Sequence, residues 1–263
     1  MSHLFPEKVT VWLSIDSMTF IKSSRKKTQE NSCVLVMPFD QNDALKSIDR
    51  ALDQYKEKHS RAARLTVVVS NVFVQYLLLE SQSEIKSFEE ERVYVEYKYR
   101  QVFDQLASTL EFSWDTGLNS RSIFSSAIPE KLISSLKDSC KRHGFGLDSV
   151  QPYLMVLFNR VFNKPENKTR CAVIEGGQFI YFEIVNGQFL RLHQRYCPED
   201  LNAHIDVLLQ RENLLSHVEQ DSSKMVVFTS SNNLKISHSL ASVHYFTPEN
   251  LIMHKKSHDL TVK

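Results

Sequence analysis

The stretch from Arg170 to Gln194 reads RCAVIEGGQFIYFEIVNGQFLRLHQ and predicts three consecutive β-strands joined by two tight turns. Gly176-Gly177 marks the first turn, and Asn186-Gly187 is a strong signal for a type I′ hairpin. A helix is predicted from Pro198 to about His217, and an apolar strand is predicted at 225–229. This half of the chain therefore predicts three strands, a helix and a buried strand.

The start of the chain predicts the same order of elements. Strands at 9–13, 18–22 and 33–37 precede a helix at 43–58, and an apolar strand follows at 65–69. Three strands, a helix and a strand, present twice, are the internal duplication expected of the actin-like (ribonuclease H-like) fold. We therefore expect an α/β protein with this duplicated fold.

A longer segment lies between the two predicted copies. It contains a charged, mostly helical stretch at 84–110, in which the alternation at 93–99 leaves a strand open as an alternative. The polar segment NKPENKT at 163–169 is the best candidate for an internal boundary. We expect a first domain at 1–162 with a subdomain inserted at about 64–150. A second, reduced domain is expected at 170–263, without the fourth subdomain of the full fold.

Composition places the chain among ordinary globular proteins and disfavours several functions. Its 263 residues are 42% hydrophobic and carry a formal net charge of +1, which is atypical of a nucleic-acid-binding protein. The four cysteines form no pair or cluster with metal-ligand spacing, which favours reduced thiols. No signal peptide and no apolar run long enough to span a bilayer are present, so we expect a cytoplasmic protein. No hydrolase elbow, Walker loop or metal motif indicates catalytic residues or a metal site.

At 65–80, LTVVVSNVFVQYLLLE, the chain resembles a specific family. A strand, a turn and a second strand start an inserted subdomain there, and the family's later landmarks follow in order at Ala127, Pro129, Gly144, Val150 and Pro152. The chain resembles the bacterial actin-like scaffolds that include the type IV pilus assembly protein PilM and the cytoplasmic domain of the type II secretion protein GspL. The resemblance implies a non-catalytic cytoplasmic scaffold that is peripheral to the inner membrane. It would bind a cytoplasmic peptide of an inner-membrane assembly protein and reach the membrane only through that partner.

Two loops depart from the nucleotide-binding members of the family. The first phosphate loop of those members has Asp followed by Gly- and Ser-rich residues, whereas this chain keeps Asp16 and Ser17 without glycine. The second matching loop is Glu175-Gly176-Gly177, with Glu in place of Asp. Because phosphate loops need close backbone approach, we expect a degenerate site without a nucleotide cofactor. An actin-like ATPase with atypical loops, in which Asp16 and Glu175 hold Mg-nucleotide, is the alternative.

Three tyrosines in the charged stretch are candidates for a partner groove. Tyr94, Tyr97 and Tyr99 could line a peptide site, because aromatic residues are enriched at interfaces. Packing of the helix on its own sheet is the alternative interpretation of the same residues. The acidic run at 89–91 is expected to face solvent, and a homodimer is possible. The sequence does not specify the machine served, the partner, or whether any nucleotide binds.

Overall fold

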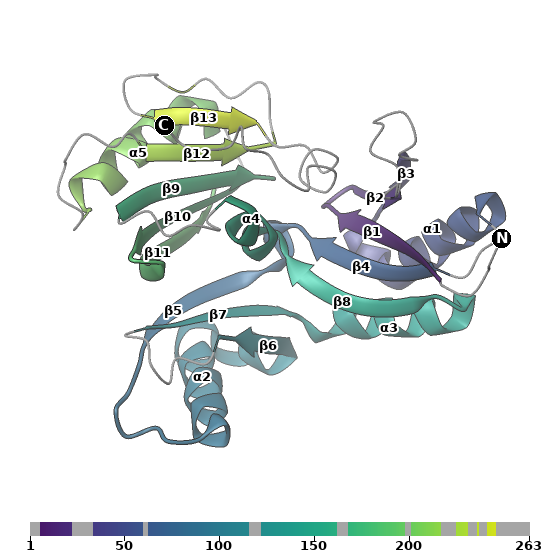
Figure 1. The fold of residues 1–263 in the computed structure, drawn as a ribbon, viewed down its shortest axis with the longest axis horizontal. Helices are drawn as coiled ribbons and strands as arrows, with labels where there is room; N and C mark the ends of the chain where they lie inside the picture. Colours follow the sequence, from purple (N-terminus) through teal and green to yellow (C-terminus); the bar gives the residue numbers. More distant parts are fainter. Residues whose placement is uncertain are drawn as a thin grey trace. The chain divides into compact units, whose positions relative to one another are not determined.

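The computed structural model describes residues 6–22, 34–59, 63–115, 122–161, 168–197, 201–216, 225–230, 236 and 241–245 (Figure 1). The chain forms two compact units. The first contains the segments up to Phe73 and Pro129–Leu157, and the second contains Val74–Ile128 and Phe158–Phe246. No helix among the described residues is long and apolar enough to cross a membrane.

The first unit is built on a five-stranded mixed sheet in the order β3-β2-β1-β4-β8. β1, β2 and β3 run antiparallel, whereas β4 and β8 run parallel to β1. The helices α1 and α3 pack against one another. The bounds are β1 (Glu7–Leu13), β2 (Ser17–Lys22), β3 (Val34–Pro38), α1 (Ala44–Lys58), β4 (Ala63–Val69), α3 (Glu130–His143) and β8 (Gly146–Pro152).

Local sequence signals explain the helices of this unit. Ile48, Leu52 and Tyr55 on α1 are spaced three and four residues apart and are buried, as helical periodicity predicts. Leu45, three residues before Ile48, is 39% exposed. Helix α3 ends at Gly144, whose φ of 78° is a left-handed conformation that favours glycine.

The second half of the chain repeats the sheet of the first unit. Its strands have the order β11-β10-β9-β12-β13, with three antiparallel strands followed by two parallel ones. Asn186-Gly187 and Gly176-Gly177 form the two hairpin turns with positive φ at every position, as expected. The duplicated α/β fold is therefore confirmed. The bounds are β9 (Lys168–Glu175), β10 (Gln178–Val185), β11 (Gln188–Tyr196), α5 (Leu201–Leu214), β12 (Met225–Thr229) and β13 (Ala241–Tyr245).

The two halves differ in what separates their parallel strands. Residues 70–145 lie between β4 and β8, whereas only residues 230–240 lie between β12 and β13. A crossover between parallel strands needs about a dozen residues by itself. The connection in the second half is therefore too short to hold an insertion of the size found in the first half.

The inserted subdomain contains fewer residues than the sequence analysis predicted. It forms a three-stranded sheet in the order β5-β7-β6 with helix α2 beside it (Figure 1). The predicted bounds of about 64–150 are wrong, because β4 and β8 pair within the first sheet and leave only 74–128 as the insertion. The alternating run at 93–99 is helical. The bounds are β5 (Gln75–Glu80), α2 (Phe88–Phe103), the 3₁₀ segment Asp104–Thr109, β6 (Leu110–Trp114) and β7 (Ser122–Pro129).

We expected the insertion to belong to the first domain. In the structure it packs with the second half of the chain instead. The side chain of Gln194 on β11 accepts from the amide of Tyr76 at 3.0 Å and donates to the carbonyl of Val74 at 2.8 Å. The rings of Phe124 and Phe189 stack with centroids 4.5 Å apart. Both contacts join the insertion to β11. The boundary predicted at 163–169 lies mainly outside the described residues.

The chain passes from the first unit to the second half through α4 (Tyr153–Val161), whose start is fixed in the first unit. Asn71, fully buried in the turn after β4, accepts from the amide of Leu154 at 3.2 Å. The rings of Trp12 and Tyr153 meet edge to face at 4.6 Å. The asparagine therefore satisfies one of the amides that a helix start leaves without an internal partner.

Candidate functional site

The first loop that matches a phosphate loop is a tight turn between β1 and β2. Ser14 Oγ donates to Asp16 Oδ1 at 2.7 Å and accepts from the amide of Ser17 at 3.2 Å. The amide of Ser14 donates to the carbonyl of Ser17 at 2.8 Å. Asp16 is exposed, but one of its oxygens is already engaged within the turn. The amides of Ser14 and Ser17 are therefore used inside the loop rather than presented to a phosphate.

The second matching loop is the hairpin turn between β9 and β10. Gly176 and Gly177 have φ values of 56° and 81°, which a type I′ turn requires at both central positions. The carbonyl of Gly177 accepts from the amide of Cys197 at 2.7 Å. Glu175 is buried at 6% exposure. The turn alone accounts for both glycines, so they do not by themselves indicate a nucleotide.

The two loops belong to different units, Asp16 and Ser17 to the first, and Glu175, Gly176 and Gly177 to the second. Across the described ranges, no group of three or more His, Cys, Asp or Glu side chains could hold a metal ion. The residues of each loop have locally determined roles in a turn. A nucleotide role for them stays a prediction.

The three candidate tyrosines of α2 point in different directions. Tyr99 is fully buried and donates to the carbonyl of Gln75 at 3.1 Å, and its burial raises the pKa of its phenol far above the usual range. Tyr94 is half-buried and donates to the carbonyl of Glu80 at 3.0 Å. Tyr97 is 54% exposed. The structure thus places Tyr99 in the core and leaves Tyr97 as the exposed aromatic of the three.

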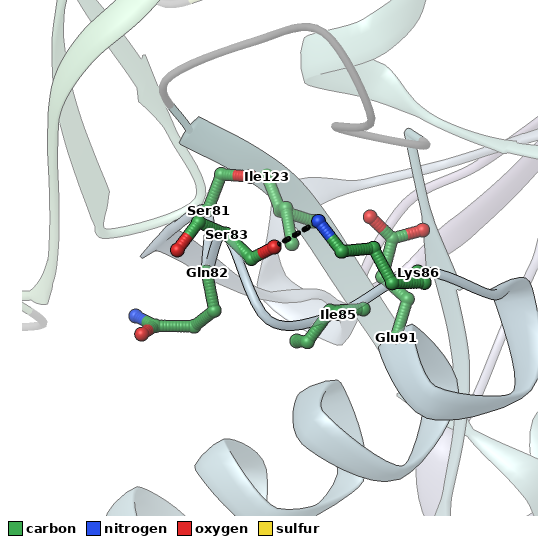
Figure 2. A pocket seen from close by; sticks show the side chains of 7 residues that line it. All are labelled: Ser81, Gln82, Ser83, Ile85, Lys86, Glu91 and Ile123. Carbon is green, nitrogen blue, oxygen red and sulfur yellow. Dashed lines mark hydrogen bonds between the residues drawn. The ribbon is translucent and has the colours of Figure 1, made fainter.

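A feature that the sequence analysis missed lies at the start of α2. Glu91, expected to face solvent within the acidic run, is only 2% exposed and lines a small pocket (Figure 2). Its Oε2 accepts from the indole Nε1 of Trp114 at 3.0 Å. The signal was present in the spacing, because Glu91 lies four residues before Val95 and eight before Tyr99, the two buried residues of this helix face.

A second buried polar cluster joins α5 to the second sheet. Glu212, fully buried on α5, accepts from Arg191 Nη2 at 2.8 Å and lies 2.9 Å from His193 Nδ1. Glu183, also fully buried, accepts from the hydroxyl of Tyr181 at 2.7 Å. The cluster ties the helix to β10 and β11 by charge as well as by apolar packing.

Comparisons with known proteins give structural likeness without sequence likeness. No protein-family model and no curated protein matches the chain. The cytoplasmic domain of EpsL, an inner membrane component of the type II secretion system of Vibrio cholerae, matches with a TM-score of 0.58 and 11% identity over 93% of this chain and 92% of that one. A PilM-PilN type IV pilus biogenesis complex matches with a TM-score of 0.60 and 9% identity over 94% and 90%.

A third matching structure is described by its fold. A Bacteroides thetaiotaomicron protein with an actin-like ATPase fold and unknown function matches with a TM-score of 0.58 and 11% identity over 90% of this chain and 92% of that one. This chain has the actin-like fold. The resemblance inferred from 65–80 and the landmarks that follow it is thereby confirmed for the fold. Because at least nine-tenths of both chains align in each pair, the actin-like likeness includes the insertion as well as the two halves.

Proposed function

We propose that the protein is a non-catalytic cytoplasmic scaffold of a pilus-type or secretion-type envelope assembly. It would bind the cytoplasmic segment of an inner-membrane partner and lie beside the inner membrane through that partner. The observation that carries the proposal is the likeness along nearly the whole chain to the EpsL cytoplasmic domain and to the PilM-PilN complex. The first of these proteins belongs to an inner membrane component of a type II secretion system, and the second structure is a type IV pilus biogenesis complex.

The geometry of the two loops supports a scaffold over an ATPase. Ser14 engages the carboxylate of Asp16, and the hydroxyls and amides of the turn bond to one another. Gly176 and Gly177 serve a tight hairpin turn. A phosphate needs backbone amides that point outward at close range, which glycine-rich loops provide. Both loops are complete as turns without a ligand.

Crosslinked affinity purification from native cells tests the scaffold proposal. The tagged chain is expected to enrich an inner-membrane protein, and Tyr97→Ala is expected to reduce that enrichment because Tyr97 is an exposed aromatic on α2. Tyr196→Ala is the matched control, since Tyr196 is equally exposed at 55% on β11. Recovery of no inner-membrane protein in repeated experiments would contradict the proposal.

Isothermal titration with Mg-ATP and Mg-ADP tests the alternative of an actin-like ATPase. No binding heat is expected at high protein concentration. Micromolar binding that is lost in Asp16→Ala and in Glu175→Gln would favour the ATPase instead. This alternative is tested because the third matching structure is described as having an actin-like ATPase fold.

A further inference from the structure

Strand β3 is the outer strand of the first sheet, and one of its sides has no neighbouring strand among the described residues (Figure 1). Its sequence VLVMP contains no charged residue, and its pairing with β2 runs without a register shift. Natural sheet edges are usually protected by charged side chains or by bulges, because unpaired backbone groups attract further strands. β3 has neither, and its one proline, Pro38, is its last residue.

The opposite edge of the same sheet, β8, is protected in both ways. Asp148 on β8 forms an ion pair with Arg64 of β4. The pairing of β8 with β4 also changes register between Leu65 and Thr66. A neutral, regular edge in a sheet whose other edge is charged and irregular indicates that β3 is the edge suited to a further strand.

The backbone groups on the open side of β3 follow from its register with β2. The amide of Phe39 donates to the carbonyl of Asp16 at 2.8 Å, so these two residues form a hydrogen-bonded pair. Such pairs alternate along an antiparallel ladder, so Leu35 and Met37 also bond to β2. The residues between them direct their backbone groups to the open side, and these residues are Val34, Val36 and Pro38.

The side chains of β3 show the same alternation between its two faces. Val34 and Val36 are 39% and 59% exposed, whereas Met37, on the other face of the strand, is 5% exposed. Two exposed β-branched side chains on one face of a strand pack well against β-branched side chains of an adjacent strand. The open side of β3 therefore offers both backbone groups and apolar side chains.

We propose that β3 pairs with β3 of a second copy of this chain, antiparallel and centred on Val36. Around the two-fold axis, Val36 lies opposite Val36 of the second copy, and Val34 lies opposite Pro38. The two Val36 residues exchange two hydrogen bonds, and each Val34 amide donates to a Pro38 carbonyl. Because proline has no amide, only the Val34 carbonyls stay unpaired in this ladder.

A second copy is the occupant that this edge fits best. The chain's own sequence completes the ladder from both sides, and two neutral strands do not repel each other. A charged peptide from another protein finds no opposite charge on β3 to attract it. The edge is only five residues long, so the expected association is weak and depends on protein concentration. The inference concerns self-association and does not depend on the scaffold role.

Sedimentation equilibrium of the full chain over a range of concentrations tests the proposal. The wild type is expected to show a monomer–dimer equilibrium. Val36→Lys brings like charges together, and Val36→Pro removes an outward amide without removing a bond to β2, so each is expected to raise the dissociation constant at least about tenfold. Val207→Lys is the matched control, because Val207 is equally exposed at 61% on α5, and it is expected to change nothing. Circular dichroism verifies the fold of each variant.

Hydrogen exchange at single amides tests the register of the pairing. The amides of Leu35 and Met37 are expected to be protected at every concentration because they bond to β2. The amides of Val34 and Val36 are expected to gain protection only as the dimer forms. A monomer at all concentrations, or a dimer that Val36→Lys leaves intact, would overturn the proposal. Protection of the Val36 amide in the monomer would also overturn it, because the chain itself would then pair with β3.

Discussion

Replacing Gln194 by alanine is expected to loosen the insertion from the second half of the chain. Its carboxamide makes two hydrogen bonds to the start of β5, with the amide of Tyr76 at 3.0 Å and the carbonyl of Val74 at 2.8 Å. Val74 and Tyr76 are 0% and 3% exposed, so water replaces the lost partners poorly. Each backbone group left without a partner costs about 1–3 kcal/mol, and we expect a total loss of about 2–4 kcal/mol.

Hydrogen exchange read at single amides measures this loss where it arises. The amide of Tyr76 bonds to the side chain of Gln194, so its exchange is expected to accelerate by about 5–30-fold for each 1–2 kcal/mol lost locally. Amides in the strands of the first sheet, such as that of Val67, are expected to keep their protection because they belong to the other unit. Urea unfolding gives the global free energy for comparison.

Gln188→Ala is the matched control for this prediction. Gln188 lies on the same strand, is exposed, and loses the same atoms on substitution. It is expected to change the unfolding free energy by less than about 0.5 kcal/mol. Unchanged exchange at Tyr76 in Gln194→Ala, or equal effects of the two substitutions, would refute the reasoning that this carboxamide joins the insertion to β11.

Three further perturbations test other parts of the fold. Burial raises the pKa of Asp49, but the hydrogen bonds with His143 and Arg142 on α3 and the charge of Arg142 outweigh this and lower it. The ionised carboxylate therefore stabilises the fold at pH values above its ordinary pKa, and this contribution is lost as the pH falls through the lowered pKa of the folded state. Asp49→Asn is expected to flatten the pH dependence of the unfolding free energy, measured with urea, between about pH 5 and 2. Glu212→Ala is expected to cost about 3 kcal/mol in urea unfolding because it removes the partner of Arg191, and Arg191→Met in the same chain is expected to restore part of it. A Cβ atom added at Gly144 would meet no atom within 4 Å, so only the positive φ disfavours Gly144→Ala. Thermal unfolding should show a loss of about 1–2 kcal/mol in the free energy of unfolding, and a smaller loss for Gly144→Asn.

Local chemistry made the duplicated fold predictable. The Gly-Gly and Asn-Gly pairs specify turns with positive φ, and the apolar runs beside them specify strands of the right length. Gly144 ended α3 as a left-handed cap, which is also a signal of one or two residues. The order of elements follows from such short signals, and its repetition in the two halves predicted the duplicated fold.

Long-range pairing set the limits of the prediction. Whether β4 and β8 belong to the first sheet depends on Leu65 pairing with Leu147, and no local pattern in either strand contains that information. The predicted bounds of the insertion therefore included too many residues. The same limit applies to its packing, since the bond between Gln194 and the backbone of Tyr76 joins residues far apart in the sequence.

The same limit explains why the sequence analysis placed Glu91 wrongly. Glu91 was assigned to solvent because its neighbours are acidic, yet it occupies the helix face of Val95 and Tyr99. A carboxylate can be buried only where hydrogen-bond donors meet it, and one such donor is the indole of Trp114, 23 residues further along the chain. The spacing of Glu91 with Val95 and Tyr99 indicates which helix face it shares, but no local pattern shows that a donor waits on that face.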